Sequence, residues 1–330
     1  MTPTAIIEAP QIDTIEARFR AMGSDVHVVI VAGPAGLAAY ADNRIQQLEA
    51  RWSRFQPTSE ICALNRCAGH AEPVSDDTRL LIVRAVEAWR LTGGSFDPTM
   101  LDAIEAAGYD RSFEMIADEG GRSRTVRPID AAGCVDIVID HDAVTIPAGL
   151  GFDPGGIGKG LAADIVAGEL IAAGATGACV NMGGDLRVIG ASPNGNGWTV
   201  AIDHPWSSVP VALVGLTAGA VATSTVLRRR WTIDGCVRHH LIDPSTSEPS
   251  TSDLALASVI AGTAWQAEVL AKAALLRGSD RAFDLLDGSN ASLVVDRDGA
   301  VSASAGLANY LGGVALDPTV TFDRQTPAQG

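Results

Sequence analysis

The chain has few aromatic residues (5%), no close pair of cysteines and no long uninterrupted apolar segment, although it has 330 residues. Its five cysteines are odd in number and scattered, which excludes a disulfide framework or a thiolate metal site and favours free or buried thiols in a reducing compartment. Residues 211–227 come nearest to a membrane span, but Thr, Ser and Gly interrupt them, and we expect a pair of strands there. The first 20 residues lack the basic leader and apolar core of a signal peptide. A cytoplasmic protein without membrane insertion is therefore predicted.

Basic residues are also scarce. The 24 Lys and Arg residues against 39 Asp and Glu residues give a net charge of −15. Nucleic acids and anionic membranes need a basic surface, so neither is an expected partner. A phosphorylated cofactor remains compatible with this charge, because backbone amides or a cation can neutralise its phosphates.

The apolar fraction of 47% and the charged fraction of 19% are typical of a globular protein with one large or two ordinary domains. Helical spacing of apolar residues predicts helices at residues 37–55, 77–92, 160–173 and 264–276. Strands are predicted at residues 26–31, 177–180, 186–189, 198–202, 211–216, 231–233, 257–260 and 292–296, and a hairpin at 134–147. Residues 111–130 are expected to form a polar surface excursion. Strands and helices do not alternate strictly, which favours an α+β fold with mixed or antiparallel sheets flanked by helices.

A glycine-rich segment, Gly151 to Gly160, precedes the third predicted helix and contains Lys159. Glycines let the backbone approach a ligand closely, and the amides at a helix start favour an anion such as a phosphate. The segment is not a Walker loop, because Gly160 follows the lysine, and it lacks the GxGxxG spacing of a dinucleotide fold. Taken alone, it fits a tight turn that caps a helix equally well.

Three further loops carry polar residues. Asn181 to Asp185 follows a predicted strand, Thr92 to Thr99 follows a predicted helix, and His239 and His240 precede Leu241 to Pro244. Each pattern is also typical of an ordinary turn or of a structural histidine.

Considered in order, these segments resemble the ApbE-type FAD:protein FMN transferases over about three quarters of the chain. The matching segments are Met22-Gly23-Ser24, Ser59-Glu60-Ile61 with Leu64-Asn65, Gly94 to Thr99, Asp153 to Gly160, Val180 to Asp185, Ala222-Thr223-Ser224 and His240 to Pro244.

The resemblance implies an ApbE-like, T-fold-related domain over residues 19–316, between tails at 1–18 and 317–330. Two lobes with the cofactor cleft between them are one form that this domain could take. It implies that the protein cleaves FAD, releases AMP and attaches FMN through a phosphoester bond to a Thr or Ser of an acceptor flavoprotein, with Mg²⁺ as the divalent cation.

The resemblance also implies site residues. Those expected at FAD are Met22, Phe55, Gly94, Ser95, Phe96, Asp97, Asp153, Lys159 and Ile242, with Lys159 near the pyrophosphate. Those at the magnesium positions are Gly156 and Ala271 through their carbonyls, Glu268, and Lys272.

The late helix departs from the family pattern, because Glu268 and Lys272 stand where Asp and Thr are usual. Glutamate keeps an oxygen ligand suited to a hard cation, whereas a protonated lysine cannot bind a metal. Glu268 and Lys272 either form a surface pair one helical turn apart, or Lys272 supplies a charge in place of part of the cation site. We prefer the second interpretation.

The expected chemistry is attack of the acceptor hydroxyl on the FMN-side phosphorus, with Lys159, the loop amides and the cation neutralising the charge. His240, with an imidazole near its ordinary pKa, is the preferred general base, and His239 is the alternative. Two other functions remain open: a metal-dependent FAD pyrophosphatase and a non-catalytic FAD-binding or carrier protein.

Overall fold

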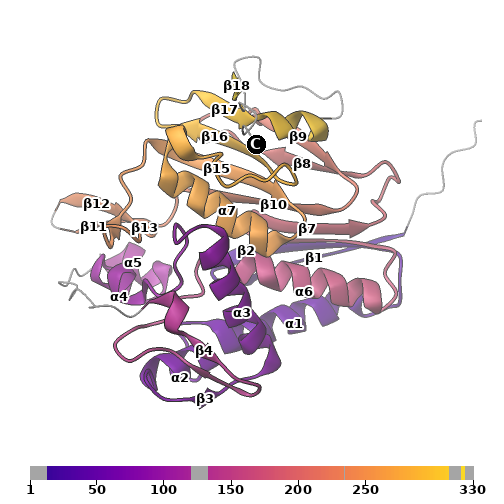
Figure 1. Cartoon of the computed structure of the whole chain (residues 1–330). Helices are drawn as coiled ribbons and strands as arrows, with labels where there is room; N and C mark the ends of the chain where they lie inside the picture. Colours follow the sequence, from indigo (N-terminus) through magenta and orange to yellow (C-terminus); the bar gives the residue numbers. More distant parts are fainter. Residues whose placement is uncertain (1–12, 120–132, 234, 312–320, 324–330) are drawn as a thin grey trace, which may run out of the picture.

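The computed structural model describes residues 13–119, 133–233, 235–311 and 321–323. Its centre is a nine-stranded sheet with the order β1-β2-β6-β7-β10-β15-β16-β17-β18. Neighbouring strands are antiparallel except β17 and β18, which run parallel, so the sheet is mixed. Helices cover one face of this sheet, and the β8–β9 hairpin lies over the other (Figure 1). The predicted α+β class is confirmed.

The strands of the large sheet are β1 Thr14–Ala21, β2 Ser24–Val31, β6 Gly177–Met182, β7 Asp185–Gly190, β10 Gly219–Thr225, β15 Leu254–Ala261, β16 Ala291–Asp296, β17 Val301–Ser304 and β18 Thr321–Asp323. The smaller sheets contain β3 Glu72–Pro73, β4 Val138–Ile139, β5 Ala143–Thr145, β8 Trp198–Ile202, β9 Ala212–Leu216, β11 Arg230–Ile233, β12 Cys236–His239, β13 Ile242–Asp243 and β14 Glu248–Pro249. The α-helices are α1 Leu37–Trp52, α2 Glu60–Arg66, α3 Asp76–Leu91, α4 Leu101–Ala106, α5 Phe113–Glu119, α6 Gly158–Ala172 and α7 Ala264–Arg277. Three 3₁₀ turns, η1 Cys134–Asp136, η2 Ser279–Arg281 and η3 Ala305–Tyr310, complete the described elements.

Strand β2 shows why the large sheet is buried on both faces. Val28 and Ile30 pack into the core beneath the helices, whereas Val29 and Val31 pack into the core beneath the β8–β9 hairpin. Successive side chains of a strand point to opposite faces, so an apolar run without polar alternation fits a strand that is covered on both sides.

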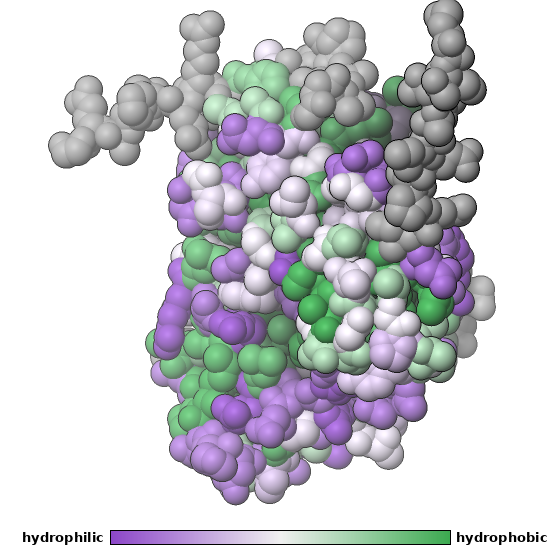
Figure 2. Space-filling view, turned by 90° about the vertical axis from the view of Figure 1, so that its right-hand side faces the viewer, coloured by the Kyte–Doolittle hydropathy of each residue, from purple (hydrophilic) through white to green (hydrophobic). Residues whose placement is uncertain are grey.

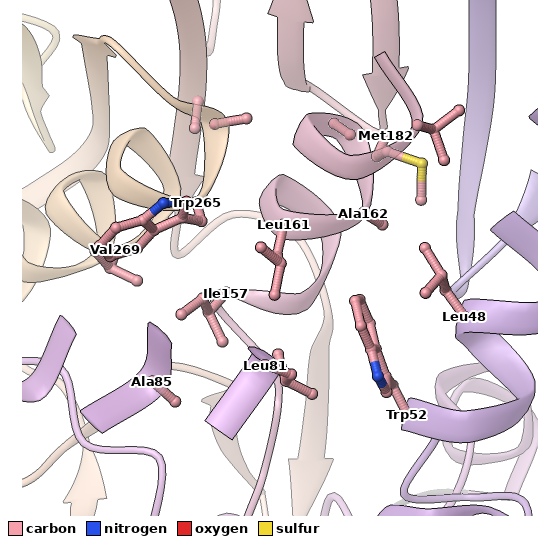
Figure 3. Close-up of a cluster of buried hydrophobic side chains, with 14 of the residues drawn as sticks. Leu48, Trp52, Leu81, Ala85, Ile157, Leu161, Ala162, Met182, Trp265 and Val269 are labelled. Atoms are coloured by element: carbon pink, nitrogen blue, oxygen red, sulfur yellow. The ribbon is translucent and has the colours of Figure 1, made fainter. Parts of the chain in front are cut away.

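The helical face has a core in which four helices meet (Figure 3). Trp52 of α1, Leu81 of α3, Leu161 of α6 and Trp265 of α7 are all buried there. Burying such a side chain stabilises the fold by roughly 1.5–3 kcal/mol, so this cluster fixes the helices that carry the loops described below.

The start of α7 is fixed on α6. The carboxylate of Asp164 accepts hydrogen bonds from the backbone N–H groups of Ala264 and Trp265, both at 2.9 Å, and so caps α7. A Cβ atom at Gly160 would clash with the carbonyl oxygen of Ala264, so only glycine permits this approach. Because of this close crossing, the side chains of α7 reach the glycine-rich loop that precedes α6.

Four predictions of local structure need correction. Residues 14–18 belong to β1, so the predicted tail over 1–18 is wrong there, and residues 321–323 of the predicted C-terminal tail pair with β17. Residues 211–227 contain β9 and β10, which lie in different sheets rather than pairing with each other. Residues 113–119 of the predicted surface excursion form α5, and residues 120–130 of that excursion lie outside the described residues.

Among the helices that the structure describes, none is both long and apolar enough to cross a bilayer. Figure 2 shows the side of the molecule on which β1 and the end of α6 lie, where hydrophilic and hydrophobic residues are intermingled. The five cysteines are all unpaired, as expected.

Candidate active site

A cavity of about 1620 Å³ lies where the glycine-rich loop, the end of α1 and the β6–β7 turn meet. This volume exceeds the roughly 300–1,000 Å³ of ordinary small-molecule sites, so it can hold a large ligand. The predicted site residues that line it are Met22, Phe55, Asp153, Gly156, Lys159, His240, Glu268 and Lys272. The tertiary structure therefore brings together residues from five separate segments of the sequence.

The predicted FAD loop at residues 94–97 lies behind the glycine-rich loop and is not part of the described lining of the cavity. Phe96 is fully buried, and its ring would lie 3.4 Å from a Cβ atom at Gly156. Ser95 accepts a hydrogen bond from Nε of Arg277 at 2.9 Å. Asp97 accepts one from the backbone N–H of Thr99 at 2.8 Å, and Gly94 has a left-handed φ of 81°. Phe96 therefore supports the glycine-rich loop, and direct contact of these four residues with FAD stays a prediction.

Two other predicted residues are also outside the lining that the described residues form. Ile242 packs in a buried cluster with Tyr109 and Trp231, and Ala271 is buried within α7. Tyr109, in the same cluster as Ile242, does line the cavity. The predicted roles of Ile242 beside the cofactor and of the Ala271 carbonyl at a metal stay predictions.

Asn65 of α2 holds the glycine-rich loop in place. Its side chain donates to the carbonyl of Phe152 at 2.9 Å and accepts from the backbone N–H of Phe152 at 2.7 Å. Asp153 then accepts from the backbone N–H of Gly155 at 3.1 Å. Gly156 has a φ of 100°, and a Cβ atom there would lie 2.9 Å from Cδ of Lys272. Glycine at 156 therefore lets Lys272 cross the loop closely, in a backbone conformation that other residues rarely adopt.

Lys159 is already paired within the protein. Its ammonium donates to Asp185 of β7 and to Oε1 of Glu268 on α7, the latter at 2.5 Å. Oε2 of Glu268 accepts from the backbone N–H of Gly160 at 2.8 Å, so both oxygens of Glu268 are engaged. Burial alone lowers the pKa of Lys159, but the negative charges of Asp185 and Glu268 outweigh it and raise this pKa. Lys159 therefore links α6 to β7 and to α7 through two ion pairs.

Burial raises the pKa of Glu268, and the positive charge of Lys159 opposes that shift. The hydrogen bonds that Glu268 accepts from Lys159 and Gly160 favour its ionised form and so oppose the effect of burial.

Lys272 also enters the cavity, but it has no such pair. Its Nζ donates to the carbonyl of Gly155 at 3.4 Å and lies 5.2 Å from the centre of the Phe96 ring. No carboxylate oxygen of the described residues lies within 4.0 Å of this ammonium. Burial lowers the pKa of Lys272, and the charges of Asp153 and Glu268 oppose this. The surface-pair interpretation is wrong, since Glu268 is 3% exposed and binds Lys159.

The two histidines differ in their surroundings. Nδ1 of His239 accepts from the backbone N–H of Leu241 at 3.3 Å, so its Nε2 carries the proton and donates to the carbonyl of Ser250 at 3.1 Å. His239 is thus used within the fold. His240 lines the cavity, and its buried Nδ1 has no hydrogen-bond partner in the described part of the chain.

The pKa of His240 differs from the expected one. Burial first, and then the charges of Arg229 and Lys272, hold it well below the ordinary value of 6.5. The expectation of an ordinary imidazole pKa is wrong. His240 is therefore neutral at pH 7, as a proton acceptor must be.

Trp52 and Arg54 line the cavity as well, although neither residue belongs to a motif identified in the sequence. The side chain of Arg54 is 6% exposed, and its Nε lies 3.4 Å from Asp153. Its guanidinium carbon lies 4.2 Å from the centre of the Phe55 ring and 4.5 Å from that of Tyr109. Nη2 of Arg54 and Nε1 of Trp52 are buried and have no partner among the residues described. One Trp and one Arg near a helix end give no pattern that would single them out.

The donor set that is present does not fit the magnesium site implied by the resemblance. Of the two side chains in that set, Lys272 cannot ligate a cation, and both oxygens of Glu268 are engaged by Lys159 and Gly160. In the described ranges, no group of three His, Cys, Asp or Glu side chains is placed to hold a metal ion.

Known proteins show the same sequence pattern and fold. The sequence model of the ApbE family matches residues 22–295. A FAD:protein FMN transferase of Treponema pallidum (strain Nichols) is 29% identical over 282 residues, which cover 80% of this chain and 78% of that protein. One of Salmonella typhimurium (strain LT2) is 27% identical over 314 residues, which cover 90% of this chain and 85% of that protein.

Two crystal structures are similar throughout. The ApbE protein of Thermotoga maritima superposes with a TM-score of 0.81 at 26% identity, covering 91% of this chain and 99% of that one. The apo form of the flavinyl transferase ApbE of Pseudomonas stutzeri superposes with a TM-score of 0.79 at 25% identity, covering 94% of this chain and 100% of that one. Since the family match extends over most of its length, this chain belongs to the ApbE family.

Proposed function

We propose that this chain is a FAD:protein FMN transferase that attaches FMN to a Thr or Ser hydroxyl of an acceptor flavoprotein and releases AMP. One observation carries the proposal beyond family membership. Trp52, Arg54 and His240 all line one large cavity, and each has a buried polar atom without a described partner. Buried polar groups are almost always hydrogen-bonded, so such a gathering indicates a ligand that completes them.

The reaction requires one bond to form and one to break. The acceptor oxygen bonds to the FMN-side phosphorus of FAD, and the bond from that phosphorus to the bridging oxygen breaks. AMP leaves with the electron pair. The hydroxyl proton passes to the imidazole of His240, which is neutral and lines the cavity. An imidazole that is already neutral is available as a base at pH 7.

Charge neutralisation comes from the start of α6 and from α7. Phosphoryl-type transfers depend mainly on positioning and on stabilising charge at the phosphorus and the leaving group. The ammonium of Lys272 and the positive end of the α6 dipole lie in the lining of the cavity. Lys159 contributes indirectly, because it holds α6, β7 and α7 together through Asp185 and Glu268.

Magnesium dependence was expected from the resemblance, but the protein donors do not fit it, and the steps above use only residues of this chain. We identify no motif in this sequence that would recognise the acceptor protein. A cytoplasmic location stays a prediction.

The test is incubation of the purified chain with FAD and a flavoprotein subunit that has been expressed without its covalent FMN. We expect AMP release together with an acceptor mass increased by one FMN. Release of AMP with free FMN and unmodified acceptor would instead show a pyrophosphatase. Bound FAD without AMP release would show a carrier protein, and absence of FAD binding would contradict all three functions.

A further inference from the structure

We propose that the ammonium of Lys272 takes the place of a divalent cation at the diphosphate of FAD, so that this chain binds FAD without metal. The inference rests on the proposed function, since it concerns the same ligand. It explains why the magnesium donor set does not fit this chain.

The geometry places Lys272 at the glycine-rich loop. Its side chain extends from α7 across Gly156, where a Cβ atom would lie 3.3 Å from Nζ. Nζ donates to the carbonyl of Gly155 at 3.4 Å, and the face of Phe96 supports it from behind. Gly158 and Lys159, which begin α6, lie in the same lining, although the backbone N–H of Gly158 already donates to the carbonyl of Pro154 at 3.0 Å and that of Gly160 to Glu268 at 2.8 Å. The ammonium of Lys272 and the positive end of the α6 dipole thus form one electropositive wall, which suits a diphosphate.

The charges of the site identify Lys272 as the ammonium that remains available. The chain contains only two lysines, Lys159 and Lys272, and both line this cavity. Lys159 is neutralised by Asp185 and Glu268. Lys272 has no carboxylate within 4.0 Å among the described residues, and its single hydrogen bond leaves two of its three donors free. An anionic ligand is therefore the partner that its charge requires.

The same arrangement disfavours a protein-held cation. Glu268, the one carboxylate of the expected donor set, binds Lys159 and Gly160. A cation placed beside the Gly155 and Gly156 carbonyls would also meet the positive charge of Lys272. The ammonium and the cation are therefore alternatives at this position.

The experiment measures FAD binding to the full chain by calorimetry, once in EDTA and once in excess Mg²⁺. We expect the wild-type Kd to agree within about twofold between the two conditions. Lys272→Thr should weaken binding in EDTA by roughly 10- to 100-fold, the loss expected for a hydrogen bond to a charged group. Excess Mg²⁺ should restore part of that loss, because threonine offers an oxygen ligand. Lys272→Arg, which keeps the charge, should resemble the wild type in EDTA.

Riboflavin, which lacks the diphosphate, is the control ligand, and its affinity should be the same for wild type and Lys272→Thr. If wild-type protein binds FAD only with Mg²⁺, or if Lys272→Thr binds FAD in EDTA as well as wild type does, the inference is wrong. The first of these measurements needs no variant. A wild-type protein that binds no FAD in either condition contradicts the proposed function itself.

A second measurement uses the small number of lysines. Acetic anhydride should acetylate Lys272 in free protein, and FAD in EDTA should protect it, as read from peptide masses. Equal acetylation with and without saturating FAD would overturn the inference.

Discussion

Two parts of the same cavity wall contrast in their hydrogen bonding. The paired cluster consists of Lys159, Asp185 and Glu268, whose charged atoms bind one another. The unpaired groups are Trp52, Arg54 and His240, each with a buried polar atom that has no described partner. The lysine in the most prominent sequence motif lies in the paired cluster and stabilises the fold. The groups left for a ligand come from positions that mostly carry no motif.

The contrast has an energetic basis. A buried polar atom without a partner costs about 1–3 kcal/mol, and a ligand that supplies the missing acceptor or donor recovers that energy. Replacing a member of the paired cluster should therefore lower stability, whereas replacing Arg54 or His240 should mainly lower binding or turnover. Trp52 also packs in the helical core, so its replacement should lower stability as well.

The largest expected effect is on turnover. His240→Ala should reduce FMN transfer by about 10²- to 10⁴-fold, the range for loss of a general base, while FAD still binds. Single-turnover transfer and calorimetry measure the two quantities separately.

His239→Gln is the matched control, because glutamine keeps a donor for the Ser250 carbonyl. It should retain near wild-type transfer. Unchanged transfer by His240→Ala would remove His240 from the mechanism.

The next effect is on stability. Glu268→Ala should lower the free energy of unfolding by about 3–5 kcal/mol, because it breaks a buried ion pair and leaves Gly160 N–H without its acceptor. Urea unfolding followed by circular dichroism measures this. Asp76→Ala breaks an exposed ion pair with Arg79 and should cost at most about 1 kcal/mol. Equal losses for the two variants would refute the structural role of the paired cluster.

Arg54 should show the reverse pattern. Arg54→Leu removes a donor that has no described protein partner, so FAD binding should weaken by roughly 10- to 100-fold. Its melting temperature should fall less than that of Glu268→Ala, since the Nε contact with Asp153 at 3.4 Å is long. An Arg54→Leu protein with wild-type FAD affinity would show that FAD does not bind to the guanidinium of Arg54.

The smallest effect is a pH dependence. In the unfolded chain an imidazole takes up a proton near pH 6.5, whereas burial keeps His240 neutral in the folded chain. The unfolded state therefore binds more protons below that pH, and stability rises as pH increases through 6.5. Between pH 7 and pH 5, the wild type should lose about 1–2 kcal/mol more than His240→Ala does. The acid limb of the transfer rate should likewise lie below pH 6.5, and a limb at higher pH would contradict this.

Much of the fold followed from local patterns. The helix predicted at residues 264–276 is α7, and the strand predicted at 198–202 is β8. Both depend on spacing within one segment. The predicted tails failed because β1 and β18 are edge strands, whose pairing with β2 and β17 no pattern within the tails themselves records.

The sequence by itself determined the α+β class, the glycine-rich turn before α6 and the family, because each depends on residue types and their spacing. Only the tertiary structure decided that Lys159 is paired, that His240 rather than His239 faces the cavity, and that Arg54 lies beside Asp153. Lys159 and Glu268 are 109 positions apart, and Arg54 and Asp153 come from different elements. Partners at such separations are chosen by the packing of α6 against α7 and by the cost of leaving a buried charge alone, which no local pattern records.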